Sequence, residues 1–358
     1  MAAPRPEALA PRLLAWFDRA QRDLPWRRSR DPYAIWISEV MLQQTQVDRV
    51  TAYYPRFLTA FPTVQALAAA PLDEVLRQWE GLGYYTRARH LHRAAQAIVA
   101  QHAGRFPDDY ATARSLPGVG DYTAGAVLSI AYGQRLPALD ANARRVLFRV
   151  FLRKSEGAAK ARKRLDQVGA AAVPEGRPGD YTQALMELGA LVCLPRNPKC
   201  EECCLADICT ALRQGRPEAQ AARAQAKRST GRVALAVVMR NGKVLLAQRP
   251  EEGVWGGLWE FPNVELQDAE DPRTALTDLL GSNLGLRVSL GESVGHVTHG
   301  IMNRRLEIDA YAGEVVGGRV HPRWHQRAVW VDPGALAEYA LPSPHRRLAD
   351  MLFGGVAP

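Results

Sequence analysis

All five cysteines of the 358-residue chain fall between Cys193 and Cys209. Four of them follow the spacing Cys193-x6-Cys200-x2-Cys203-x5-Cys209. Four thiolates on a short loop after a helix can bind a tetrahedral metal ion or an iron–sulfur cluster, whereas a disulfide framework would spread its cysteines more widely. Because zinc and iron–sulfur clusters both accept four sulfur ligands, the spacing leaves both open. Cys204 lies outside the pattern, and we expect it to be a packed free thiol.

Two carboxylates occupy positions that suit acid–base chemistry. Glu39 lies among apolar residues early in a predicted helix, where desolvation would raise its pKa and keep it a usable proton donor. Asp140 follows an apolar run and precedes a helix, whose first N–H groups favour its ionised form. Cleavage of an N-glycosidic bond needs one acid for the departing base and one carboxylate for the cationic sugar. Taken alone, Glu39 could still be a surface residue and Asp140 only a helix N-cap.

Residues 116–128, LPGVGDYTAGAVL, contain a glycine turn that leads into a helix. Gly118 and Gly120 permit a tight turn with successive exposed N–H groups at the helix N-terminus, a position that favours a phosphate. This pattern fits a helix-hairpin-helix, which grips a DNA backbone independently of base sequence. An ordinary helix N-cap would explain the pattern nearly as well.

The formal net charge of +9 is unevenly distributed. Residues 1–230 contain 33 Lys and Arg against 22 Asp and Glu, whereas residues 231–358 contain 13 against 15. A basic surplus confined to one part indicates a polyanion partner, nucleic acid first, although a merely soluble Arg-rich surface is the alternative. No apolar run approaches the ~18–20 residues of a membrane span, and charge and proline interrupt the N-terminus. We therefore expect a cytoplasmic, DNA-associated protein without a membrane partner.

The chain divides into a helical part, a linker and a mixed part. Residues 1–212 show helical periodicity, including one buried helix face across residues 35–57. Residues 213–231 are polar and rich in Ala, Gln and Arg, as expected of an interdomain linker. Residues 232–358 begin with two strand-like runs joined at Asn241-Gly242, a hairpin signal. Further strands are predicted at 304–315 and 327–332 and a helix at 272–285, so this part is α+β.

Several ordered motifs now resemble one family. ISEVMLQQTQV, GLGYYTRARHL, LPGVGDYTAGAVL, LDANARRVL and the cysteine spacing resemble the adenine DNA glycosylases (the MutY family) of the helix-hairpin-helix superfamily. The resemblance is close over residues 22–210 and weaker beyond. It implies an all-α glycosylase domain with a [4Fe–4S] cluster at 193–209, followed by a Nudix-like α+β domain. It also implies that Glu39 protonates adenine N7 and that Asp140 stabilises the sugar cation.

The resemblance assigns roles to two neighbours of these carboxylates. Tyr122 occupies the position where the related endonuclease III type carries a lysine that attacks the sugar. A lysine can form a Schiff base and then cut the strand, but a tyrosine cannot, so we expect a monofunctional glycosylase. Asn142 would orient Asp140 or a water. Ala141 departs from the glycine usual at its position, which restricts the local backbone.

Other residues would contact DNA. The resemblance places Trp26 and Arg27 at the adenine pocket, with Gln44 and Tyr84 as wedges that fill the duplex when the base is flipped out. Tyr84 could otherwise be a core aromatic. Gly118 and Gly120 belong to the hairpin described above.

The C-terminal part resembles a Nudix fold without its metal site. A Nudix box holds Mg²⁺ through a glutamate cluster. Aligning its closing glycine on Gly285 places Asp278, Leu279, Ser282 and Asn283 at its Arg and Glu positions, so we expect no nucleotide hydrolysis.

The resemblance instead predicts a lesion-recognition domain. Thr298 and His299 are similar to a Ser-His pair that reads 8-oxoguanine, and Ser and Thr can both hydrogen-bond the lesion. Val297 replaces the family's phenylalanine. An ordinary pair of core or surface histidines, His296 and His299, is the alternative.

These observations predict a monomeric enzyme of base excision repair. Its substrate would be double-stranded DNA with adenine opposite 8-oxoguanine or guanine. The competing hypotheses are an oxidised-pyrimidine glycosylase/lyase of the endonuclease III type, a non-catalytic DNA-binding protein that carries a cluster, and, least, a nucleotide hydrolase.

Overall fold

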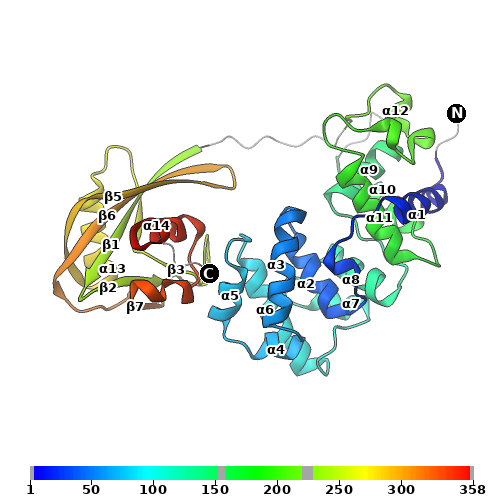
Figure 1. The fold of residues 1–358 in the computed structure, drawn as a ribbon. Coiled ribbons are helices and arrows are strands. Elements are labelled where there is room, and N and C mark those ends of the chain that lie inside the picture. The colour runs from blue at the N-terminus through cyan, green and yellow to red at the C-terminus, as the bar shows by residue number, and fades with distance from the viewer. Residues whose placement is uncertain (1–3, 152–157, 220–228, 355–358) are drawn as a thin grey trace. The chain divides into compact units, whose positions relative to one another are not determined.

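The computed structural model describes residues 4–151, 158–219 and 229–354. The chain forms two compact units, one of residues 1–69 with 90–224 and one of residues 70–89 with 225–358 (Figure 1). Within the described ranges no helix is both long and apolar enough to cross a membrane. The domain boundaries at 212 and 232 stay a prediction, and residues 220–228 of the proposed linker lie outside the described residues. Residues 70–89, which we assigned to the helical part, group with the C-terminal part.

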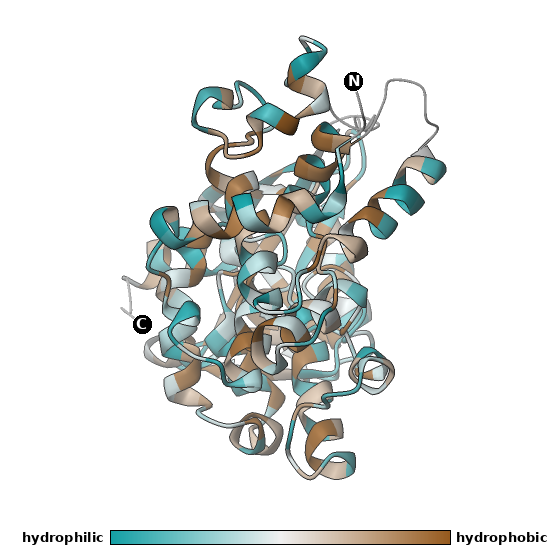
Figure 2. Cartoon of the chain, turned by 90° about the vertical axis from the view of Figure 1, so that its right-hand side faces the viewer, coloured by the Kyte–Doolittle hydropathy of each residue, from teal (hydrophilic) through white to brown (hydrophobic). Residues whose placement is uncertain are grey.

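The first unit is helical, as the sequence predicts. Most of its helices carry apolar residues on part of their circumference and hydrophilic residues on the rest (Figure 2), whereas α2 (Pro32–Leu42) is buried on nearly every side. Short 3-10 turns precede or follow them, among them η2 (Pro25–Arg27). The α-helices are α1 (Leu9–Ala20), α2 (Pro32–Leu42), α3 (Val47–Ala60), α4 (Val64–Ala69), α6 (Thr86–Gln101, which begins in the second unit), α7 (Tyr110–Ser115), α8 (Asp121–Tyr132), α9 (Ala141–Phe151), α10 (Ala158–Ala171), α11 (Pro178–Leu191) and α12 (Thr210–Arg213).

The stretch 35–57 is two helices rather than one continuous helix. The Asp31 side chain caps α2 by accepting from the backbone N–H groups of Tyr33 (3.1 Å) and Ala34 (3.4 Å). Helix α2 ends at Leu42, and Gln44 then adopts a φ of +57° before α3 begins. This left-handed backbone is uncommon for residues other than glycine. The apolar periodicity of the sequence runs through Gln44 without interruption, so it does not reveal that one helix ends and another begins there.

Two glycines of α11 allow close contact between this helix and its neighbours α8 and α9. A Cβ at Gly189 of α11 would lie 2.6 Å from Asn142 Cβ on α9, and one at Gly179 would lie 2.7 Å from the Ser129 carbonyl oxygen on α8. Real Cβ atoms do not approach this closely, so α11 can come this near to α8 and α9 only because glycine occupies these two positions. The core of α1, α9, α10 and α11 includes Leu13 and Leu188, both fully buried.

The second unit is built on a mixed sheet of seven strands with the order β3-β2-β1-β6-β5, to which β4 (on β1) and β7 (on β2) add. Its elements are α5 (Leu72–Trp79), β1 (Ser229–Arg240), β2 (Lys243–Gln248), β3 (Trp259–Glu260), β4 (Asn263–Leu266), α13 (Pro272–Leu284), β5 (Leu286–Ile301), β6 (Arg304–Gly318), β7 (Arg327–Val331) and α14 (Ser343–Phe353). Strands β1 and β6 are parallel, and β5 and β6 form a long antiparallel hairpin. The turn at Asn241 and Gly242, both with positive φ, confirms the predicted hairpin.

Both faces of this sheet are covered because β1 alternates two apolar sets. Val233 and Leu235 face a cluster that includes Leu348 of α14, whereas Ala234 and Ala236 face a cluster that includes the apolar residues of α13. The predicted fold class, a helical domain followed by an α+β domain, is confirmed.

The Gly189 contact gives a first prediction. Gly189→Ala should lower the melting temperature by several degrees, because the new methyl must displace Asn142 and overpacking costs roughly 1–3 kcal/mol. Gly176→Ala is the matched control, since a Cβ there meets nothing within 4 Å. Circular dichroism melts of the three proteins test this, and equal melting temperatures would show that α9 and α11 can separate at no cost.

Candidate functional site

A buried carboxyl on α2 is the centre of the site. Glu39 is only 5% exposed, and the Tyr122 hydroxyl at the start of α8 donates to its Oε2 at 2.6 Å. Burial raises the pKa of Glu39 to about 7, although the Tyr122 hydrogen bond lowers it; the nearby charge of Asp140 raises it further. Near neutral pH the carboxyl therefore carries a proton much of the time, a condition that a general acid must meet.

Tyr122 remains a neutral phenol in this setting. Burial and the charges of Glu39 and Asp140 raise its pKa well above the usual value. A phenol held beside a carboxylate can only donate to it, so Tyr122 favours the ionised form of Glu39 without removing its proton-donor character.

Asp140, just before α9, is held by two donors. The Ala143 backbone N–H donates to Oδ1 at 2.6 Å, and Asn142 Nδ2 donates to Oδ2 at 3.0 Å. Burial raises the pKa of Asp140 and outweighs both of these hydrogen bonds, which lower it. The expectation that helix N–H groups simply favour the ionised form was incomplete, because it neglected burial. Like charges in one site disfavour each other, so an ionised Asp140 helps to keep the proton on Glu39.

Arg145, on α9, joins this network to the cysteine loop. Its Nη2 donates to Asn142 Oδ1 (2.8 Å) and to the Gly189 carbonyl (2.7 Å), and its Nε donates to the Cys193 carbonyl (2.8 Å). Asn142 in turn holds Asp140, so a continuous hydrogen-bonded path leads from the carboxylate to the first cysteine. Sequence reasoning missed Arg145.

The four patterned cysteines line one small cavity, and Cys204 is not among its lining residues. Among the described residues no group of three or more His, Cys, Asp or Glu is close enough to hold a single metal ion. Four thiols that line a common cavity match the four sulfur ligands that an iron–sulfur cluster needs.

Arg149 supports this loop from α9 and was also missed. Although an arginine, it is 2% exposed, and it donates to Cys193 Sγ at 3.3 Å and to the Leu194 and Pro195 carbonyls at 2.7 and 3.0 Å. A buried guanidinium needs such partners, and here they fix the backbone on one side of the first cysteine.

Trp26 and Arg27 lie on η2, and both are largely buried. The Trp26 ring packs edge-on against Tyr54 at 5.7 Å. Arg27 donates to both carboxylate oxygens of Glu187 at 3.0 Å, and Arg22 donates to the same group at 2.9 and 2.7 Å. Burial raises the pKa of Glu187, but these hydrogen bonds outweigh it and lower the pKa to about 2. Arg22 and Glu187 carry no motif that would have revealed them.

The predicted DNA-contacting residues of the first unit lie in turns. Gly118, between α7 and α8, has a φ of +74°, and a Cβ there would lie 2.6 Å from His90 Cβ. Gly120 has an ordinary φ of −96° with open space around it, so its conformation does not require glycine. Gln44 is exposed at positive φ between α2 and α3. A strained, exposed polar residue suits a contact residue.

The second unit holds the remaining candidates. Tyr84 is 47% exposed with a φ of +48°, so it is not a core aromatic. On β5, Thr298 is exposed and His299 is half-buried, while Val297, the residue before Thr298, is buried in the sheet core. The valine therefore fills a core position in place of the family's phenylalanine. Burial lowers the pKa of His299, which keeps the imidazole neutral.

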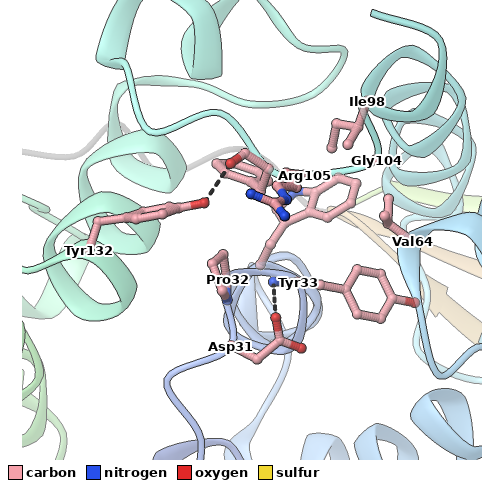
Figure 3. A pocket seen from close by; sticks show the side chains of 10 residues that line it. Asp31, Pro32, Tyr33, Val64, Ile98, Gly104, Arg105 and Tyr132 are labelled. Carbon is pink, nitrogen blue, oxygen red and sulfur yellow. Dashed lines mark hydrogen bonds between the residues drawn. The ribbon is translucent and has the colours of Figure 1, made fainter. Parts of the chain in front are cut away.

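A separate cavity of about 230 Å³ lies away from these groups. Figure 3 shows Arg105, Val64 and Ile98 around it, with Tyr132 donating to the Phe106 carbonyl at 2.5 Å. None of the predicted site residues lines it.

Three family models match the chain. Residues 37–170 match the HhH-GPD superfamily base excision DNA repair protein, residues 193–209 match the iron-sulfur binding domain of endonuclease III, and residues 233–351 match the NUDIX domain. The cysteine loop is therefore an iron–sulfur cluster site, which confirms the predicted cofactor. When bound, the cluster would be ligated by Cys193, Cys200, Cys203 and Cys209.

Individual relatives agree with these models. The chain is 36% identical to the adenine DNA glycosylase of Homo sapiens over 84% of its own length and 65% of that protein. It is 42% identical to that of Mycobacterium tuberculosis over 60% of its own length and 73% of that protein. A solved thermostable thymine-DNA glycosylase superposes with a TM-score of 0.53 at 30% identity, over 58% of this chain and 97% of that one. The chain thus spans less than two thirds of its human relative.

The environment of Glu39 predicts a pH-dependent stability. Because its pKa rises from 4.5 unfolded to about 7 folded, the wild type loses on the order of 3 kcal/mol as pH rises through this window. Glu39→Gln should therefore melt close to the wild type at pH 4.5 and clearly above it at pH 8. Glu187→Gln is the opposite control: its lowered pKa stabilises the fold above pH 4.5, so the variant should melt below the wild type at pH 7. A Glu39→Gln variant without any gain at pH 8 would show that the carboxyl is solvated.

Proposed function

Since the chain belongs to the adenine DNA glycosylase family, we propose that it excises adenine mispaired with 8-oxoguanine or guanine. The reaction hydrolyses the N-glycosidic bond and leaves an abasic site in double-stranded DNA. The observation that carries the proposal is the pairing of a buried carboxyl, Glu39, with a partly buried one, Asp140, each held by different partners. Glu39 is held by the Tyr122 phenol and has a pKa of about 7, and Asp140 is held by two N–H donors.

These environments suit the two roles that the bond cleavage needs. Glu39 donates a proton to adenine N7, which makes the base a better leaving group as the bond from C1′ to N9 breaks. Asp140, in its carboxylate form, lies opposite the developing sugar cation, and a water then attacks C1′. Asn142 and Arg145 act on Asp140 by orientation, because neither has a proton to exchange near neutral pH.

A monofunctional reaction is supported by the scarcity of amine nucleophiles. The chain contains six lysines, and none of them lies in residues 1–153, the segment that carries Glu39, Tyr122 and Asp140. Strand cleavage by the lyase route needs a lysine amine to form a Schiff base with the sugar. We therefore infer that water is the final nucleophile, in contrast to the glycosylase/lyase alternative.

The remaining residues fit recognition rather than chemistry. We infer that the Gly118 hairpin binds phosphate, that Gln44 and Tyr84 fill the gap left by the flipped adenine, and that Thr298 with His299 reads the opposite base. Within α13, Leu279, Ser282 and Asn283 replace the metal-binding glutamates of a Nudix box, so this domain would recognise the lesion without hydrolysing nucleotides.

A duplex with one adenine opposite 8-oxoguanine tests the proposal. The wild type should produce an alkali-labile site at that adenine and no strand break before alkali. Glu39→Gln should bind the duplex with unchanged affinity but lose excision by about a hundredfold to ten-thousandfold, the range expected when a general acid is removed. Gln65→Ala, a surface change in the first unit, is the control. Breaks without alkali would favour the lyase alternative, and normal turnover by Glu39→Gln would remove that residue from its role.

The pKa directions predict a bell-shaped rate profile. Single-turnover excision should fall as pH rises through about 7, because Glu39 loses the proton that it must donate. The rate should also fall on the acid side, because Asp140 must be ionised and burial raises its pKa. A rate that stays constant from pH 6 to 9 would contradict the assignment of Glu39 as the acid.

A further inference from the structure

The segment between α5 and α6 presents Tyr84 from a braced loop. The Trp79 Nε1 donates to the Gly83 carbonyl at 3.1 Å, and Arg87 donates to the same oxygen at 3.0 Å. The Arg87 guanidinium also lies 5.2 Å from the Trp79 ring and 5.7 Å from the Tyr84 ring. These contacts hold an exposed aromatic at positive φ, so the loop has one preferred form.

Both ends of this loop are bonded to the C-terminal part of the second unit. Glu80, at the start, accepts from Arg346 of α14 at 2.7 and 3.1 Å and from the Leu341 backbone N–H at 3.1 Å. The two side chains of this ion pair are only 17% and 20% exposed. Arg89, at the end, is 6% exposed and donates to the Gly256 carbonyl. The position of Tyr84 therefore depends on α14 and on the turn at Gly256.

The same two elements hold the strand that carries the predicted lesion-reading residues. Arg347, next to Arg346 on α14, donates to the Thr298 carbonyl at 2.8 Å. Trp255, next to Gly256, packs its ring 5.8 Å from the His299 ring and 5.9 Å from the His345 ring of α14. Adjacent residues thus support the Tyr84 loop on one side and the Thr298–His299 strand on the other.

We propose that α14 and the Trp255–Gly256 turn form a bracket that sets the Tyr84 loop and the Thr298–His299 strand as one lesion-reading surface. Within it Arg346 is a positioning residue that acts through Tyr84. The proposal rests on the proposed function. It adds that Tyr84, which fills the gap left by the flipped base, and Thr298 with His299, which read the opposite base, are positioned by the same scaffold. A rigid common scaffold lowers the cost of ordering both elements on the same base pair.

A double-mutant cycle tests the bracket with A opposite 8-oxoguanine. Arg346→Gln should slow single-turnover excision about tenfold, as expected when a partly buried ion pair loses one partner. In a Tyr84→Ala background the same change should slow excision less than about twofold, because the group that it positions is absent. Arg273→Gln, which breaks the exposed Arg273–Glu292 pair of the same unit, should leave the rate unchanged. An equal loss in both backgrounds, or no loss in either, would overturn the proposal.

Amide hydrogen exchange gives a readout that does not depend on catalysis. Arg346→Gln should speed exchange in the segment 80–89 and at residues 297–299, whereas Arg273→Gln should not. Glu80→Gln removes the other partner of the Arg346–Glu80 ion pair and should speed exchange in the same two segments. Unchanged exchange in both segments would contradict the bracket even if Arg346→Gln slows excision. If the wild type fails to excise adenine while the exchange pattern appears, the proposed function fails and the scaffold stands.

Discussion

The burial of Glu39 against the Tyr122 phenol is the constraint on which the rest of the site depends. Helix α2 is buried almost all round, so the carboxyl is largely shielded from solvent and its pKa rises to about 7. Tyr122 supplies one strong hydrogen bond, which keeps the group from being a permanently neutral acid. Because the buried carboxyl ionises at high pH, the fold is less stable there, so stability is given up at a functional position.

A second set of contacts gives Asp140 a fixed place beside that acid. Asn142 orients the carboxylate, Arg145 orients Asn142, and the same arginine reaches the Cys193 carbonyl. Gly189 of α11 lies against the backbone and Cβ of Asn142, so the two helices are in close contact at this network. The iron–sulfur loop is thus joined to the carboxylate by a continuous hydrogen-bonded path, and its cysteines also pack against the core that α9 and α11 share.

The sequence predicted the parts whose signal is local. The cysteine spacing, the Asn241-Gly242 hairpin and the buried setting of Glu39 follow from neighbours in the chain. The Arg22–Glu187 and Arg145–Cys193 contacts join residues far apart in sequence, and arginine is ordinarily a surface residue, so nothing in the pattern marked them. The break at Gln44 was missed for another reason, because glutamine rarely adopts a positive φ and so gives no local signal for a turn.

The titration of Glu39 itself tests the central claim most directly. Carbon-13 NMR of glutamate carboxyls, with Glu39→Gln to assign the signal, should show a midpoint at about 7 in the wild type. In Tyr122→Phe the midpoint should move higher, because the lost hydrogen bond favoured the ionised form. A midpoint near the ordinary value of 4.5, or one that does not respond to Tyr122→Phe, would contradict the account.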